Sequence, residues 1–153
     1  MLFLFHFLAT SLEIKRIGNG EVIESGVGKN LQFAWKLDGL PPNANLAFRL
    51  YYKENLEKQY QLLSAENNGK KSETLELERN KDANLGPFDL NKLSGSCKIN
   101  LPSAICTFQL READYTHTGD YFMYHVHFGG GLGEIHDRIS LNIVGKIKSF
   151  LFT

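Results

Sequence analysis

The 153-residue sequence has no excess of charge, because its 17 basic and 17 acidic residues cancel at neutral pH. A neutral chain has no electrostatic reason to bind nucleic acid or an anionic membrane surface. The sequence also lacks an apolar run of about 18 residues, the length that a membrane-spanning helix needs. We therefore expect no nucleic acid partner and no direct membrane insertion by this segment.

Cysteine is scarce, and the two cysteines present, Cys97 and Cys106, lack the Cys-x-x-Cys spacing of zinc and redox sites. The sequence has no Asn-x-Ser/Thr acceptor for N-glycans and no glycine motif that precedes a helix to bind phosphate. None of its serines lies in a nucleophile-elbow context. These absences predict a protein that is not an enzyme and that carries no cofactor.

Short segments of alternating apolar and polar residues, separated by Gly, Pro and Asn, make up most of the chain. The clearest is residues 31–37, where every second residue is a large apolar one. Similar alternation in residues 46–52 and 139–143 predicts about eight or nine strands and an all-β sandwich or barrel. The predicted core comprises Phe33, Trp35, Phe48, Leu110, Tyr121 and Met123.

The two ends of the chain differ from the part between them. Residues 1–9 are apolar, and Ala9-Thr10-Ser11 resembles a signal-peptidase site with small residues at its first and third positions. Residues 1–11 are predicted as a signal peptide or other leader, with a first strand or non-mature sequence as alternatives. The domain is predicted to cover residues 12–145, and residues 146–153 to form a tail or linker.

Residues 106–126 resemble the corner between strands E and F of an immunoglobulin variable-type domain. That corner typically reads Asp-x-Gly-x-Tyr-x-Cys. Gly119 and Tyr121 match it, whereas His117 replaces the aspartate and Met123 the cysteine. The resemblance implies an antiparallel two-sheet immunoglobulin-like sandwich in which the Tyr121 hydroxyl forms a hydrogen bond back across the turn.

Two further segments extend the resemblance over most of the chain. Residues 28–35 are similar to the entry into strand B, with Phe33 or Trp35 where the first core cysteine belongs, and residues 137–143 are similar to strand G. The usual disulfide between strands B and F is therefore missing. Variable-type domains without it occur among adhesion receptors, and the allorecognition proteins of colonial hydrozoans resemble this sequence in that respect. The resemblance implies an extracellular or cell-surface recognition domain with a protein partner.

The two cysteines are predicted to lie opposite each other in a hairpin. Its turn is centred between Leu101 and Pro102, and Cys97 and Cys106 are equally far from that centre. A cross-strand disulfide is expected in an extracellular protein. Two buried free thiols are the alternative.

The predicted binding face depends on which residues point inward. If Tyr121 and Met123 face the core, Phe122 and Tyr124 face outward, and the same alternation turns Tyr51 outward on strand C. Strands G, F and C are neighbours in the variable-type sheet, so these aromatics would form one patch near the loop 129–133. The candidate contact residues are Tyr51, Phe122, Tyr124, Gly130 and Leu132. The partner could be the same domain on another chain; alternatively, residues beyond the domain cover this sheet.

A second interpretation rests on His125-Val126-His127, since His-x-His on a strand can hold a metal ion. The pattern resembles the first motif of the cupin jelly roll, a metal-binding enzyme family. However, Glu134 follows too late for that motif, and only His136 comes after it. We predict instead that both histidines lie at the surface or partly buried near the solvent end of their strand, that His117 lies on an exposed bend, and that no metal is bound. A passive structural module of a larger receptor is a third possibility.

Overall fold

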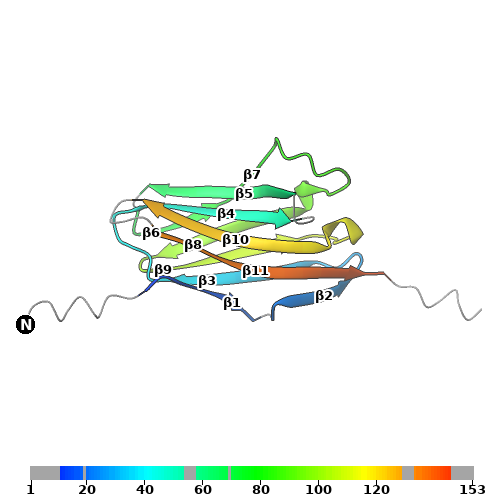
Figure 1. The fold of residues 1–153 in the computed structure, drawn as a ribbon, viewed down its shortest axis with the longest axis horizontal. Coiled ribbons are helices and arrows are strands. Elements are labelled where there is room, and N and C mark those ends of the chain that lie inside the picture. Colours follow the sequence, from blue (N-terminus) through cyan, green and yellow to red (C-terminus); the bar gives the residue numbers. More distant parts are fainter. Residues whose placement is uncertain (1–10, 19, 54–57, 69, 129–132, 146–153) are drawn as a thin grey trace, which may run out of the picture.

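In the computed structural model, residues 11–18, 20–53, 58–68, 70–128 and 133–145 are described, and they form two β-sheets packed face to face (Figure 1). The predicted all-β two-sheet sandwich is confirmed. Residues 1–10 and 146–153, which carry the predicted leader and tail, lie outside the described residues, so the predicted domain bounds stay a prediction. Within the described part of the chain, no helix is long and apolar enough to cross a membrane.

We call the five-stranded sheet the back sheet. Every neighbouring pair of its strands is antiparallel. In spatial order its strands are β1 (Glu13–Ile17), β3 (Leu31–Asp38), β9 (Ser103–Leu110), β8 (Leu93–Asn100) and β6 (Ser72–Glu76).

We call the six-stranded sheet the front sheet. Its first strand pairs in parallel with the second, and the other pairs are antiparallel. In spatial order its strands are β2 (Val22–Gly26), β11 (Gly133–Val144), β10 (Gly119–Phe128), β4 (Asn45–Lys53), β5 (Gln59–Asn68) and β7 (Glu78–Arg79). Two short 3-10 helices, η2 (Leu90–Lys92) and η3 (Tyr115–His117), lie in the connections.

The described residues contain eleven strands, more than the eight or nine that the alternation predicts, and one of the additional strands arises because the chain changes sheet in mid-course. Strand β6 pairs with β8 of the back sheet, and after one residue, Leu77, β7 pairs with β5 of the front sheet. Leu77 is buried at this crossing and donates its backbone N–H to Gly95. One extended segment therefore counts as two strands, because its two parts form hydrogen bonds with different sheets.

The core is filled from both sheets by large apolar side chains. All six residues assigned to the core by sequence are buried, with exposed fractions of 1% or less. Phe33 of the back sheet contacts the ring of Tyr121 of the front sheet at 5.8 Å between centroids. Trp35 donates its indole N–H to Asp137 of β11 at 3.0 Å, and Asp137 also pairs with Arg16 of β1. Aromatic packing and this polar contact therefore connect the two sheets.

Cys97 and Cys106 are joined by a disulfide between β8 and β9, and the two residues lie directly opposite each other in the strand register. Both are fully buried. They are the only cysteines in the sequence, so this bond lies within the back sheet and no disulfide joins the two sheets.

We expect the disulfide to stabilise the domain by about 2–3 kcal/mol, since it closes a loop of about ten residues in the unfolded chain. Urea unfolding of the wild type with and without a thiol reductant measures this difference. The double variant Cys97→Ala/Cys106→Ala is the control, because its free energy of unfolding should not respond to reductant. An unchanged wild-type midpoint under complete reduction would contradict the prediction.

Candidate protein-interaction face

The outer face of the front sheet carries a cluster of four rings, which we call the aromatic patch: Tyr51 of β4, Phe122 and Tyr124 of β10, and His136 of β11. Tyr124 lies at its centre. Its ring is 5.0 Å from Tyr51, 6.4 Å from Phe122 and 4.9 Å from His136, between centroids. The three aromatics predicted by sequence are partly buried. They therefore lie together, held partly by their own contacts.

The alternation of β10 decides which side chains form the patch. Tyr121, Met123 and His125 are buried on the inner face, and the residues between them are partly exposed on the outer face. A slip of one residue would exchange the two sets, because successive side chains of a strand point to opposite sides. The motif Gly119-x-Tyr121 thus predicts the phase in which Phe122 and Tyr124 face outward.

Some charged side chains around the patch are paired with each other, and others are not. Toward β2, Arg138 forms a hydrogen bond with Glu21, which lowers the pKa of that carboxyl, and lies 3.9 Å from Asp120. Toward β5, Lys53 lies 6.0 Å from the centre of the Phe122 ring, and Arg49 is opposite Tyr124 in the register. Among the described residues, neither Arg49 nor Lys53 has a carboxylate partner.

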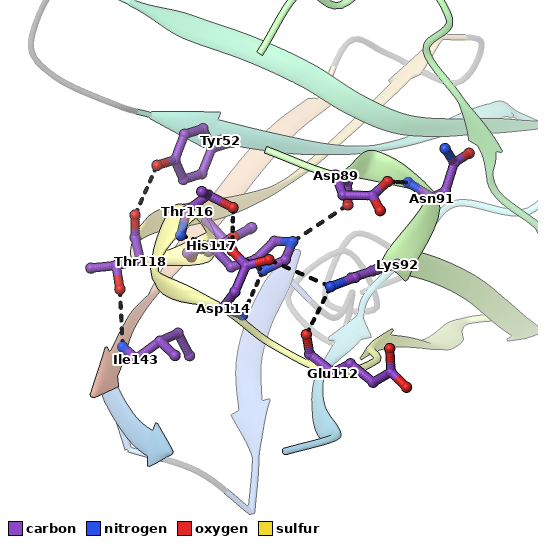
Figure 2. A network of polar contacts seen from close by, with 11 residues as sticks. Tyr52, Asp89, Asn91, Lys92, Glu112, Asp114, Thr116, His117, Thr118 and Ile143 are labelled. Carbon is purple, nitrogen blue, oxygen red and sulfur yellow. Dashed lines mark hydrogen bonds and ion pairs between the residues drawn. The ribbon is translucent and has the colours of Figure 1, made fainter. Parts of the chain in front are cut away.

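A hydrogen-bonded corner lies at the start of β10, and Figure 2 shows its contact between Tyr52 and Thr118. The corner supports the phase in which Tyr121 faces inward. The hydroxyl of Tyr121 donates to the backbone carbonyl of His117 at 2.6 Å, the contact that the family resemblance implies. Burial raises the pKa of Tyr121 well above its ordinary range, so the hydroxyl stays protonated and can donate. Tyr52 of β4 donates similarly to the carbonyl of Thr118 at 2.8 Å. Two tyrosines thus hold the bend against the inner face of the front sheet.

His117 is fully buried, so the prediction of an exposed bend is wrong. Its Nδ1 accepts from the backbone N–H of Asp114 at 3.0 Å, and its Nε2 lies 3.4 Å from the carbonyl of Asp89. The ring of Phe88 covers it at 4.7 Å between centroids. The bend is a capped 3-10 turn, and residues far away in the sequence cover it.

Asp114 is the other half of this cap. Its carboxylate accepts hydrogen bonds from the backbone N–H and the hydroxyl of Thr116, and it lies 3.5 Å from the ammonium of Lys92. Burial alone would raise the pKa of Asp114, but the hydrogen bonds from Thr116, together with the contacts to His117 and Lys92, outweigh burial and lower the pKa. The carboxylate is therefore ionised at neutral pH and keeps its capping contacts.

His125 and His127 point into the core, with exposed fractions of 0% and 7%, so the prediction that they lie at the surface or partly buried is wrong. His125 Nδ1 is 3.0 Å from the carbonyl of Ala47, and its Nε2 is 3.0 Å from His127 Nδ1. Gly133 makes room for them, because a Cβ there would lie 2.1 Å from the His127 ring. Burial, with repulsion from His127, lowers the pKa of His125 to about 4, and burial also lowers the pKa of His127.

The residues of the cupin alternative are not brought together. Glu134 lies opposite Val126 and His136 opposite Tyr124 in the register, so both point outward while the two histidines of β10 point inward. The described residues include no group of three or more histidine, cysteine, aspartate or glutamate side chains placed to hold a metal ion. The jelly-roll metal site thus has no geometric support.

Two of the predicted contact residues, Gly130 and Leu132, lie outside the described residues. Conversely, His136 belongs to the patch, whereas the sequence pattern connected it only with the cupin-like metal site. Its position follows from the register of β11 on β10, where it pairs with Tyr124. The alternation of residues along β11 indicates that His136 faces outward. Only the register of β11 on β10 places His136 beside Tyr124.

No known family model matches the sequence, and no curated protein matches it significantly. The fold is nevertheless common, since 943 chains of solved structures match it. One is murine CRIg, with a TM-score of 0.62 and 9% identity over 88% of this chain and 99% of that one.

Two other matches are similar in extent. A chain from a structure of T-cell specificity and activation by the superantigen toxic shock syndrome toxin-1 has a TM-score of 0.60 and 8% identity, covering 88% of this chain and 100% of that one. A chain from a study of multimeric cell-adhesive interactions of VGSC beta subunits has a TM-score of 0.59 and 14% identity, covering 84% and 96%. At such identities the likeness concerns the fold alone. The chain is an all-β sandwich with an immunoglobulin-like fold.

Proposed function

We propose that this chain is an extracellular recognition or adhesion domain of the variable type that binds a protein partner through its aromatic patch. The observation that carries the proposal is the cross-strand ring cluster centred on Tyr124 on an outward sheet face. The inner face of the same sheet already fills the core, so the domain needs no rings outside for its own packing. Aromatic clusters of this kind are enriched where proteins bind one another.

The strand order of the front sheet supports the variable-type assignment. Variable-type sandwiches add two strands beyond strand C to the sheet formed by G, F and C. Here β5 and β7 occupy those two places beyond β4, and β2 runs parallel beside β11 at the other edge. In the proposed variable-type assignment, the aromatic patch lies on strands G, F and C.

Two observations support an extracellular setting and a binding role. The buried disulfide is of a kind that forms in oxidising compartments. Structures of similar fold include one described for the cell-adhesive interactions of VGSC beta subunits. Both observations agree with an extracellular binding role.

The charges around the patch specify the partner further. Arg49 and Lys53 favour a partner that brings carboxylates against the β4 side of the patch and an apolar surface against its centre. A second copy of this domain has both features, because Glu24 and Glu134 lie at the β2 and β11 side of the same face. Homophilic binding is therefore the first case to test.

We expect Tyr124→Ala to weaken binding by more than about 1 kcal/mol, roughly a fivefold increase in Kd, because Tyr124 contacts every other ring of the patch. Sedimentation equilibrium measures self-association, and adhesion between cells that display the domain measures binding to another protein. Ile105→Ala is the matched control, since Ile105 is 41% exposed on the outer face of the back sheet.

Two results would contradict the proposal. If Tyr124→Ala unfolds the domain, Tyr124 belongs to the structural core. If Tyr124→Ala and Ile105→Ala weaken adhesion equally or not at all, the patch is not the interface and a passive structural module is favoured.

A further inference from the structure

The inner face of the front sheet ends in two buried histidines that the proposed function does not use. We call His125 and His127 the imidazole pair. They lie near the last residues of β10, opposite the first residues of β11. The described residues contain two more buried polar side chains: His117 holds the corner, and Asn67 caps a turn through Lys70.

The hydrogen bonds of the imidazole pair cannot be kept when both rings are protonated. The contact with the Ala47 carbonyl requires a hydrogen on His125 Nδ1. In a neutral ring His125 Nε2 is then an acceptor, so the hydrogen between the two rings belongs to His127 Nδ1. A proton on His125 Nε2 keeps this contact only if His127 takes its other neutral tautomer, in which Nδ1 accepts, and the charge is then buried. Protonation of both rings would place two N–H groups against each other at 3.0 Å and would break the contact.

In the part of the chain that the structure describes, the nearby carboxylates are engaged with other partners and do not compensate a charge on the pair. Leu46 and Phe48 flank it on β4, and Gly133 and Ile135 flank it on β11. On the same inward row of β11, Asp137 is held by Arg16 and Trp35. At the end of β3 in the facing sheet, Asp38 accepts from Ser103 and lies 3.8 Å from Lys36. Among the described residues, the one charge that shifts the pKa of His125 is that of His127.

We propose that the imidazole pair is an acid-sensitive switch. At neutral pH the end of β10 (residues 125–128) stays paired with the start of β11 (residues 133–136), and in an acidic compartment these two strand ends separate. Opening lets the rings reach water, where each can take up a proton without a buried charge. Tyr124 and His136 are opposed in the same hairpin, so opening would also disrupt the aromatic patch. This last consequence rests on the proposed function, whereas the opening itself does not.

The direction of the effect follows from proton linkage. The closed form holds the pKa of His125 at about 4, below the ordinary value of 6.5 that applies once the ring is exposed. The closed form is therefore fully stable above about pH 6.5 and loses stability as the pH falls toward 4. Between about pH 7.5 and about pH 5, His125 alone should raise the opening equilibrium about 30-fold. His127 acts in the same direction.

Amide hydrogen exchange of the purified domain at about pH 7.5 and about pH 5, corrected for intrinsic rates, tests the switch. We expect protection of residues 125–128 and 133–136 to fall about 30-fold on acidification, while the β3 and β9 amides keep theirs. The double variant His125→Gln/His127→Gln should lose this pH response. His136→Gln, which removes an outward histidine of the same hairpin, should keep it.

Equal loss of protection across both sheets, or an unchanged pH response in the double variant, would overturn the proposal. If the double variant fails to fold, an NMR titration of the wild-type imidazoles decides, because a pKa near 6.5 for His125 would also overturn it. Hydrogen exchange needs no partner. A working switch with no adhesion would therefore contradict the proposed function alone, and adhesion without the switch would contradict only this inference.

Discussion

Phe33→Ala is expected to lower the free energy of unfolding by about 3–5 kcal/mol, the usual effect of removing a large aromatic ring from a core. Phe33 is 1% exposed, and its ring lies within 5.8 Å of the rings of Trp35, Phe108 and Tyr121. Its contact with Tyr121 joins the two sheets, and no disulfide does so. The cavity would therefore form where the sandwich depends most on packing.

Urea unfolding followed by circular dichroism measures the effect. Phe128→Ala is the matched control, because Phe128 is 54% exposed and its removal should change the free energy of unfolding by less than about 0.5 kcal/mol. Similar small losses in both variants would mean that Phe33 does not pack between the sheets and that the phase of β3 is wrong.

Gly119→Ala is expected to destabilise the domain by about 2–6 kcal/mol, because two costs add. The φ angle of Gly119 is +150°, a conformation that costs other residues about 1–3 kcal/mol. In addition, an alanine Cβ would lie 2.6 Å from the ring of Tyr52, and that ring is held by the Tyr52 hydrogen bond to Thr118. Overpacking of this kind costs about 1–3 kcal/mol.

Gly20→Ala provides the comparison for this variant, since a Cβ at Gly20 meets no atom within 4 Å and Gly20 does not adopt a positive φ. Its stability should stay within about 1 kcal/mol of the wild type or rise slightly. A Gly119→Ala protein as stable as Gly20→Ala would show that the corner relaxes without cost.

The same corner connects stability to the proposed binding face. Gly119 lets the chain enter β10 beside Tyr52, and Tyr121 then reaches the His117 carbonyl from the inner face. Because side chains alternate along a strand, this anchoring of Tyr121 directs Phe122 and Tyr124 outward. We therefore expect substitutions at this corner that leave the domain folded to weaken binding as well as stability.

The sequence by itself determined the features that depend on local alternation. The apolar period of 2 in residues 31–37, 46–52 and 139–143 predicts strands and their inner faces, because the pleat turns every second side chain the same way. The pairing of Cys97 with Cys106 follows from their equal distance to a tight turn. Likewise, the outward direction of Tyr51, Phe122 and Tyr124 follows from the same alternation once one inner residue is known.

Tertiary structure alone decided which polar side chains are covered. Alternation indicates the face of His125 and His127, but their burial depends on Ala47 and Gly133, which other strands bring to them. His117 is buried because Phe88 and Asp89 cross over the turn from almost thirty residues away. The periodicity of a strand carries no information on such long-range contacts, because they depend on where the loops between other strands lie in the folded domain. The same limit explains why His136 could be placed beside Tyr124 only once the register of β11 on β10 was known.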